Sequence, residues 1–116
     1  THTRSSAASD VYKRQSQRNF RIHLGIGSVV FFLGLWLGLP PIQLAVLVLT
    51  VAAVLVLELL NTAIESVVDL AIGRRFHPLA KVAKDCAAAA VLVAAISSLV
   101  VALLLVLPPL ILRLGL

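Results

Sequence analysis

The chain has 116 residues, of which 60% are hydrophobic and 13% are charged, and its mean hydropathy is +1.06. A domain this small buries only a modest fraction of its surface, so a soluble monomer with so much apolar surface is nearly excluded. The lone Cys86 excludes an internal disulfide, and the lack of a Cys/His cluster in the sequence excludes a structural zinc site. The net charge of +5 is more typical here of the flanks of membrane spans than of nucleic-acid binding.

The N-terminal residues 1–15 differ from the rest of the chain. They are polar, rich in Ser and Ala, and without an apolar stripe at helical spacing. We therefore expect a disordered or non-native tail over 1–15, followed by a single membrane-embedded domain over 16–116.

Two long stretches, 24–57 and 86–112, carry no charge, and Pro40-Pro41 interrupts the first of them. Proline removes backbone donors and stops a helix, so these stretches predict three transmembrane helices. The expected spans are about 22–39, 42–60 continuing to 71, and 86–107.

Basic residues flank the predicted spans on one side. Arg14, Arg18 and Arg21 precede the first span, and four more basic residues lie between the second and third spans. The turn at Pro40-Pro41 is uncharged. The positive-inside rule therefore predicts a cytoplasmic N-terminus and a cytoplasmic 70–85 segment, with the C-terminus outside.

The polar residues of the second span form one stripe. On a helix, an arc of about 100° contains Glu58, Asn61, Thr62, Glu65 and Asp69. A helix that starts at residue 42 puts Glu58 about 24 Å deep, just inside the inner boundary of a hydrocarbon core about 30 Å thick. One such residue alone would suit a hydrogen bond between helices, but five on one stripe favour a functional site.

A second polar motif, H-P-L-A-K-V-A-K-D at 77–85, stands directly before the third span. Membrane anchoring explains lysines at this place but does not require Asp85. Lys81 can pair with Asp85 at i+4, while Lys84 and Asp85 together suit a phosphate and a metal or ribose hydroxyl. The sequence has neither a P-loop nor a Gly-rich kinase loop, so any nucleotide site is of another type.

These two motifs and R-N-F-R-I-H-L at 18–24 resemble the prokaryotic diacylglycerol kinase family, the small integral-membrane type that includes the undecaprenol kinases. The resemblance covers about residues 16–107. It implies an all-α homotrimer of three-span subunits in the inner membrane of a bacterial cell. Such an enzyme phosphorylates a lipid alcohol with Mg²⁺ and ATP, at active sites shared between subunits on the cytoplasmic face.

The resemblance also implies roles for single residues. Glu58 matches the general base that takes the hydroxyl proton, and Asn61 matches its neighbour in the active site. Glu65 matches a carboxylate that binds the metal on ATP, while Lys84 and Asp85 match nucleotide-binding positions. The implied reaction is direct in-line transfer of the γ-phosphoryl group, without a covalent enzyme intermediate.

The sequence departs from the family pattern at three places. Gln17 stands before R-N-F, where relatives commonly have a second glutamate that binds the metal and the nucleotide. The loop after the second span is one residue longer and carries Arg74 and Arg75 where an acid is common. The polar residues 1–15 replace an amphipathic surface helix.

Two other classes of protein stay open. In a small oligomeric channel or transporter the acids run through the membrane centre, whereas here they gather at its inner boundary. A non-catalytic assembly protein explains the small residues, such as the G-x-x-x-G pair Gly34 and Gly38, but not the acids. Among lipid alcohols, diacylglycerol and undecaprenol both suit the sequence, and the family motifs favour undecaprenol.

Overall fold

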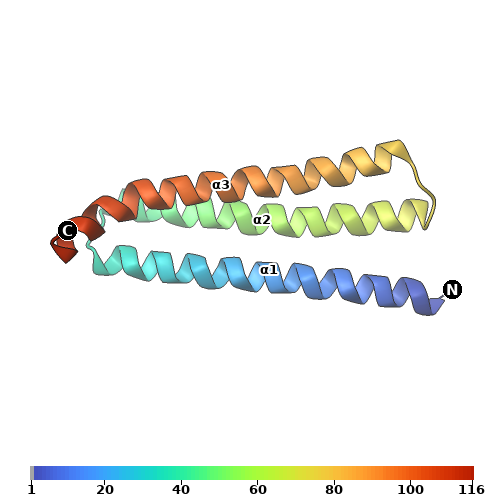
Figure 1. Cartoon of the computed structure of the whole chain (residues 1–116), viewed down its shortest axis with the longest axis horizontal. Coiled ribbons are helices and arrows are strands. Elements are labelled where there is room, and N and C mark those ends of the chain that lie inside the picture. Colours follow the sequence, from blue (N-terminus) through green and yellow to red (C-terminus); the bar gives the residue numbers. More distant parts are fainter. Residues whose placement is uncertain (1) are drawn as a thin grey trace.

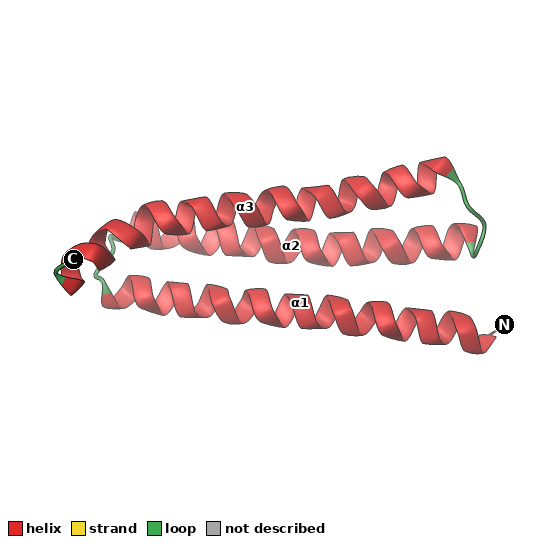
Figure 2. Ribbon diagram, viewed as in Figure 1, coloured by secondary structure: helices red, strands yellow, loops and turns green. Residues whose placement is uncertain are grey.

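The computed structural model describes the backbone of residues 2–116 and the side chains of residues 17–116. These residues form three helices, α1 (His2–Trp36), α2 (Pro41–Ile72) and α3 (Pro78–Leu114). The helices lie side by side in an elongated bundle of 60 × 25 × 23 Å (Figure 1). Only short connections separate them, and no strand occurs in the described part (Figure 2). Each helix contains a stretch long and apolar enough to cross a membrane, which confirms the expected three-span, all-α fold.

The first helix is longer than its span. Residues 2–15 are helical, and so differ from the disordered tail that their composition predicts. No Gly or Pro occurs before Gly25, and Ala, Arg, Lys and Gln favour helix, so nothing in the sequence stops the helix from extending toward the N-terminus. The stretch that can cross a membrane, Gln17–Trp36, begins only after them.

A glycine closes the turn between α1 and α2. Gly38 has a φ of +73°, and its N–H donates to the Leu35 carbonyl at 3.1 Å, while the Leu39 N–H donates to the Gly34 carbonyl at 3.1 Å. This pair of bonds is a Schellman cap, after which Pro41 opens the next helix. Gly38 therefore lies outside α1, so Gly34 and Gly38 do not form a G-x-x-x-G pair on one helix. Gly34 instead faces leucine side chains of the turn and of α2 in the same chain.

The packing differs between the two ends of the bundle. Helix α2 packs against both neighbours, whereas α1 and α3 contact each other little. The buried apolar cluster of Leu39, Leu47 and Val106 lies toward the end that holds the α1–α2 turn. Most large apolar side chains elsewhere are exposed, which suits contact with lipid. The N-terminus and the α2–α3 connection lie at the other end (Figure 1).

The third helix continues through Pro108 and Pro109 to Leu114, beyond the expected end of the span at 107. Proline bends a helix, and α3 curves toward the end of α1 in this region (Figure 1). The Arg113 guanidinium lies 4.3 Å from the centre of the Trp36 ring and donates from Nη1 to the Trp36 carbonyl at 3.3 Å. This contact joins the last turn of α3 to the C-terminal end of α1, where the helix dipole is negative.

Candidate active site

The polar stripe lies along the C-terminal half of α2, which is a regular helix from Pro41 to Ile72. The hydroxyls in this stretch bond to their own helix. Thr62 donates to the Glu58 carbonyl at 3.1 Å, and Ser66 donates to the Thr62 carbonyl at 2.9 Å. The hydrogen of each hydroxyl is therefore engaged within the helix, and the acidic and amide groups are the other polar side chains of this stretch.

Glu58 contacts the first helix. Its Oε1 lies within hydrogen-bond distance of Nδ1 of His23 on α1, so the pair joins residues 35 positions apart. The Glu58 side chain is 10% exposed and that of His23 is 35% exposed. His23 was not among the predicted site residues. Its position could have indicated a role, because His23 is the last ionisable residue before an uncharged membrane stretch.

Two buried oxygens next to this contact have no hydrogen-bond partner in the described part of the chain. They are Glu58 Oε2 and Asn61 Oδ1, which lie three residues apart on one face of α2. An unpaired buried acceptor costs about 1–3 kcal/mol, so these atoms suit a ligand that brings a donor. A hydroxyl brings one donor hydrogen, which can pair with one of these two oxygens. The structure thus brings the two expected catalytic residues, Glu58 and Asn61, together.

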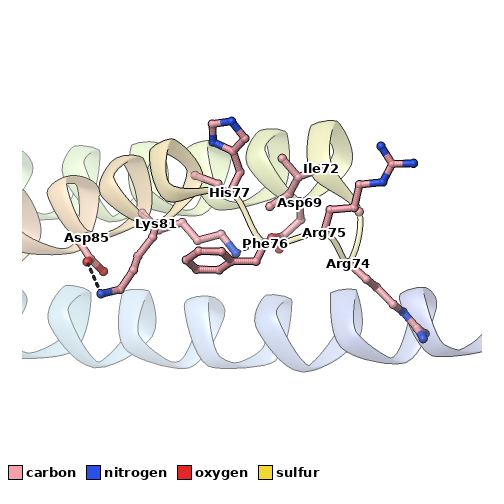
Figure 3. A pocket seen from close by; sticks show the side chains of 11 residues that line it. Asp69, Ile72, Arg74, Arg75, Phe76, His77, Lys81 and Asp85 are labelled. Atoms are coloured by element: carbon pink, nitrogen blue, oxygen red, sulfur yellow. Dashed lines mark hydrogen bonds and ion pairs between the residues drawn. The ribbon is translucent and has the colours of Figure 1, made fainter.

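A pocket of about 370 Å³ lies at the connection between α2 and α3 (Figure 3). Four Lys or Arg side chains line it, but only two carboxylates do. The charged lining residues are Arg74, Arg75, Lys81, Lys84, Asp69 and Asp85. This surplus of positive charge suits a ligand that carries phosphates. The expected nucleotide-binding residues Lys84 and Asp85 both lie here.

Two ion pairs organise the lysines of the pocket. Lys84 Nζ donates to Asp69 Oδ1 at 2.5 Å across the α2–α3 interface. Lys81 Nζ lies 3.9 Å from Asp85 Oδ2, which confirms the expected i+4 pair (Figure 3). The pairing of Asp69 was not predicted, because a carboxylate at a helix end is also consistent with plain solvation.

Helix caps on both sides of the connection position Asp69 and Lys84. Gly73, with a φ of +63°, ends α2, and its N–H donates to the Asp69 carbonyl at 2.8 Å. His77 Nδ1 accepts from the Leu79 N–H at 3.1 Å and so caps the start of α3. Because these caps fix where α2 ends and α3 begins, they set the register in which Asp69 meets Lys84.

Glu65 and Gln17 take part neither in the contact between His23 and Glu58 nor in the lining of the pocket at the α2–α3 connection. Glu65 is half-buried, and the helical rise puts it about 10 Å from Glu58 and about 6 Å from Asp69 along α2. The Gln17 side chain is exposed on α1. No three His, Cys, Asp or Glu side chains gather in a metal-binding arrangement within the described residues. Glu65 is therefore not part of such a group.

The chain matches known proteins over most of its length. The family model of the prokaryotic diacylglycerol kinases matches residues 6–106. A diacylglycerol kinase of Synechocystis sp. is 55% identical over 100 residues, which are 86% of this chain and 57% of that protein. An undecaprenol kinase of Bacillus subtilis is 44% identical over 79 residues, which are 68% of this chain and 63% of that protein. The chain thus matches less than two thirds of the length of either relative.

The matched range includes both groups of site residues, and residues 6–15 of the N-terminal segment as well. A shorter match, with a diacylglycerol kinase of Escherichia coli, is 45% identical over 58 residues, which are 50% of this chain and 47% of that protein. Because the family model covers well over half of the sequence, the relationship does not rest on the short motifs alone. The chain belongs to the prokaryotic diacylglycerol kinase family.

Proposed function

We propose that this chain is a lipid kinase that transfers the γ-phosphoryl group of ATP to the hydroxyl of a membrane lipid alcohol. The observation that carries the proposal is Glu58, a carboxylate within a membrane-spanning helix that is 10% exposed and has one unpartnered oxygen. A carboxylate at such a place is expensive and by default functional. Relatives named as diacylglycerol kinase and undecaprenol kinase support a lipid alcohol as the substrate.

In the proposed reaction, Glu58 Oε2 accepts the hydroxyl proton as the lipid oxygen bonds to the γ-phosphorus. The bond from that phosphorus to the bridging oxygen of ADP breaks at the same time, and the products are a lipid phosphate and ADP. Asn61, on the same face of α2, helps to position the hydroxyl. Phosphoryl transfer depends mainly on position and on charge neutralisation, so no enzyme nucleophile is required.

The basic pocket holds the nucleotide in this proposal. Lys84 binds a phosphate oxygen and Asp85 accepts a hydrogen bond from a ribose hydroxyl, while Asp69 keeps the lysine in place. The pocket and Glu58 lie on the same helix, with Glu65 between them. The helical rise puts Glu58 about 16 Å from Asp69 along α2, so a triphosphate that extends from the pocket along this helix points toward Glu58.

Mg²⁺ is part of the same proposal. In kinases, Mg²⁺ is usually held by one or two carboxylates together with the substrate phosphates, and the single carboxylate of Glu65 fits that donor set. The amide oxygen of Gln17 is a weaker second ligand than the glutamate of its relatives. When bound, the ion neutralises charge on the phosphates.

We further propose that the kinase is a homotrimer in the bacterial inner membrane, with its active sites shared between subunits on the cytoplasmic side. The small contact between α1 and α3 supports assembly with further copies, because it leaves faces of both helices available to pack against another chain. Mass measurement in nanodiscs should give three chains per particle. An active monomer would refute the trimer.

The test of function uses purified protein in nanodiscs with Mg²⁺ and ATP, supplied with undecaprenol, with diacylglycerol or with no added alcohol. We expect lipid phosphate to form only with an added alcohol, and faster with undecaprenol. Glu58→Gln should lower turnover by about 10²- to 10⁴-fold, the usual contribution of a general base. Thr50→Val, which removes only a hydroxyl bonded to the Leu47 carbonyl, is the matched control. Full turnover of a correctly assembled Glu58→Gln variant would refute the base.

A further inference from the structure

The contact between α1 and Glu58 has no role in the reaction described so far. We propose that His23 is a positioning residue, which holds Glu58 Oε1 through Nδ1 so that Oε2 faces the lipid hydroxyl. The proposal rests on the proposed function, in which Glu58 is the base. It assigns the two oxygens of one carboxylate to two tasks, one of them structural and the other chemical.

A glutamate just inside the boundary of the hydrocarbon core needs a hydrogen bond that holds its carboxylate in the bundle. Its side chain has three rotatable bonds, and long polar side chains near a membrane boundary turn their charged ends toward water. Glu58 lies just inside the inner boundary, so the nearest water is on the cytoplasmic side. A hydrogen bond to another helix keeps the carboxylate in the bundle instead.

The proposed role of Glu58 as a base sets the direction of the bond. A base accepts a proton, so in this proposal the Glu58 oxygen accepts and Nδ1 of His23 donates. The second oxygen, Oε2, is buried and has no partner among the described residues. It is therefore the oxygen that can receive a proton from a bound hydroxyl.

The backbone next to His23 supports the contact. Gly27, one turn further along α1, is buried against α2, and an added Cβ there would lie 2.5 Å from Cγ1 of Val51. Only glycine permits the two helices to approach this closely. The close approach lies next to the histidine, and it keeps α1 and α2 near enough for one imidazole ring to bridge them.

The experiment compares three substitutions of His23. His23→Asn keeps a donor near the position of Nδ1, His23→Gln places its donor near the position of Nε2, and His23→Leu has none. Each variant is assayed in nanodiscs for kcat and for the KM values of ATP and of the lipid alcohol, with Thr50→Val as the control. Infrared spectra without substrates record the carboxylate band that disappears in Glu58→Gln.

We expect His23→Leu to lower kcat by about 10²-fold, the usual effect of a small misplacement of a reacting group, and to change both KM values little. His23→Asn should recover most of the lost kcat and His23→Gln less. The infrared band of Glu58 should shift in His23→Leu and return toward its wild-type position in His23→Asn. If His23→Leu does not assemble, the difference between the Asn and Gln variants decides instead.

The outcomes separate this proposal from the one it rests on. An active wild-type enzyme whose His23 variants all keep its kcat and its Glu58 band would overturn the positioning role alone. Equal losses in the Asn, Gln and Leu variants would also overturn it, because no donor position would then matter. A wild-type protein that phosphorylates no lipid alcohol would overturn the proposed function.

Discussion

Lys84, a residue of the proposed nucleotide site, is held in place by an ion pair. Its ammonium group is bonded to Asp69 on the neighbouring helix, and the two side chains are 31% and 38% exposed. An ammonium on a flexible stem loses conformational freedom when it binds a phosphate. Because Asp69 already restrains the Lys84 side chain, we expect a phosphate that enters the pocket to cost less conformational entropy.

This arrangement predicts the effect of Asp69→Asn. The KM for ATP should rise by about three- to tenfold, a modest change because both partners are partly exposed and screened by water, while kcat changes little. Lys84→Ala should raise the KM at least as much. The double variant should resemble Lys84→Ala, since the two residues act as one unit. Independent, additive effects in steady-state kinetics would contradict the shared role.

The same residues show how far sequence reasoning reaches into the site. Helical spacing is enough to group Glu58 with Asn61, because both belong to one helix. The partners His23 and Asp69 depend on how neighbouring helices are rotated and how closely they approach, and a single sequence does not encode either in a local pattern. Lys81 and Asp85 could be paired in advance because they are one turn apart.

Among the helices, the junction of α1 and α2 depends on which glycines face the neighbouring helix. Gly27 is buried against Val51, whereas nothing lies within 4 Å of the Cβ position of Gly25 on the same helix. The two residues are both helical glycines in one turn of α1 and so form a natural pair for comparison.

Gly27→Ala should destabilise the protein by about 1–3 kcal/mol, because the β-branched Val51 cannot rotate its methyl groups out of the way without moving the helices. It should also lower kcat, since it moves His23 away from Glu58. Gly25→Ala should be neutral or stabilise by up to about 1 kcal/mol through helix propensity. Unfolding of the reconstituted protein by SDS in mixed micelles measures both values. Equal stability of the two variants would contradict the close approach.

The three spans were predictable because uncharged stretches of about 20 residues can hardly be buried in the core of so small a chain, so a membrane is the environment that suits them. The ends of the helices were less predictable from the sequence. Gly38 belongs to a predicted span, but its backbone adopts the left-handed conformation of a helix cap. Residues 2–15 lack an apolar stripe, although they are helical. Caps and helix extension depend on backbone conformation, on which hydropathy carries no information.

In the bundle as a unit, the basic pocket lies at the end that holds the α2–α3 connection, and the apolar cluster lies toward the end that holds the α1–α2 turn. Positive charge at the α2–α3 connection predicts that this end faces the cytoplasm. The lone Cys86 is exposed, so topology is best read in a Cys86→Ser background.

In that background, Arg75→Cys should react with a membrane-impermeant thiol reagent only in inverted vesicles. Leu116→Cys should react only from the outside, because α3 crosses the membrane between the two positions. Mass spectrometry of the labelled protein measures both reactions. Labelling of both positions from the same side would contradict a membrane crossing by α3.

The contact of Arg113 with Trp36 holds the C-terminal ends of α1 and α3 together. Together with the apolar cluster beside it, this contact joins all three helices at the end opposite the basic pocket, while α1 has few contacts with α3. Backbone amides exchange their hydrogens through local openings, which are rarest where packing is densest. Along the span of α1, exchange should therefore be slowest near Trp36 and become faster toward Gln17. We therefore expect the first helix to behave as a lever that pivots at its Trp36 end, with the largest movements at its Gln17 end.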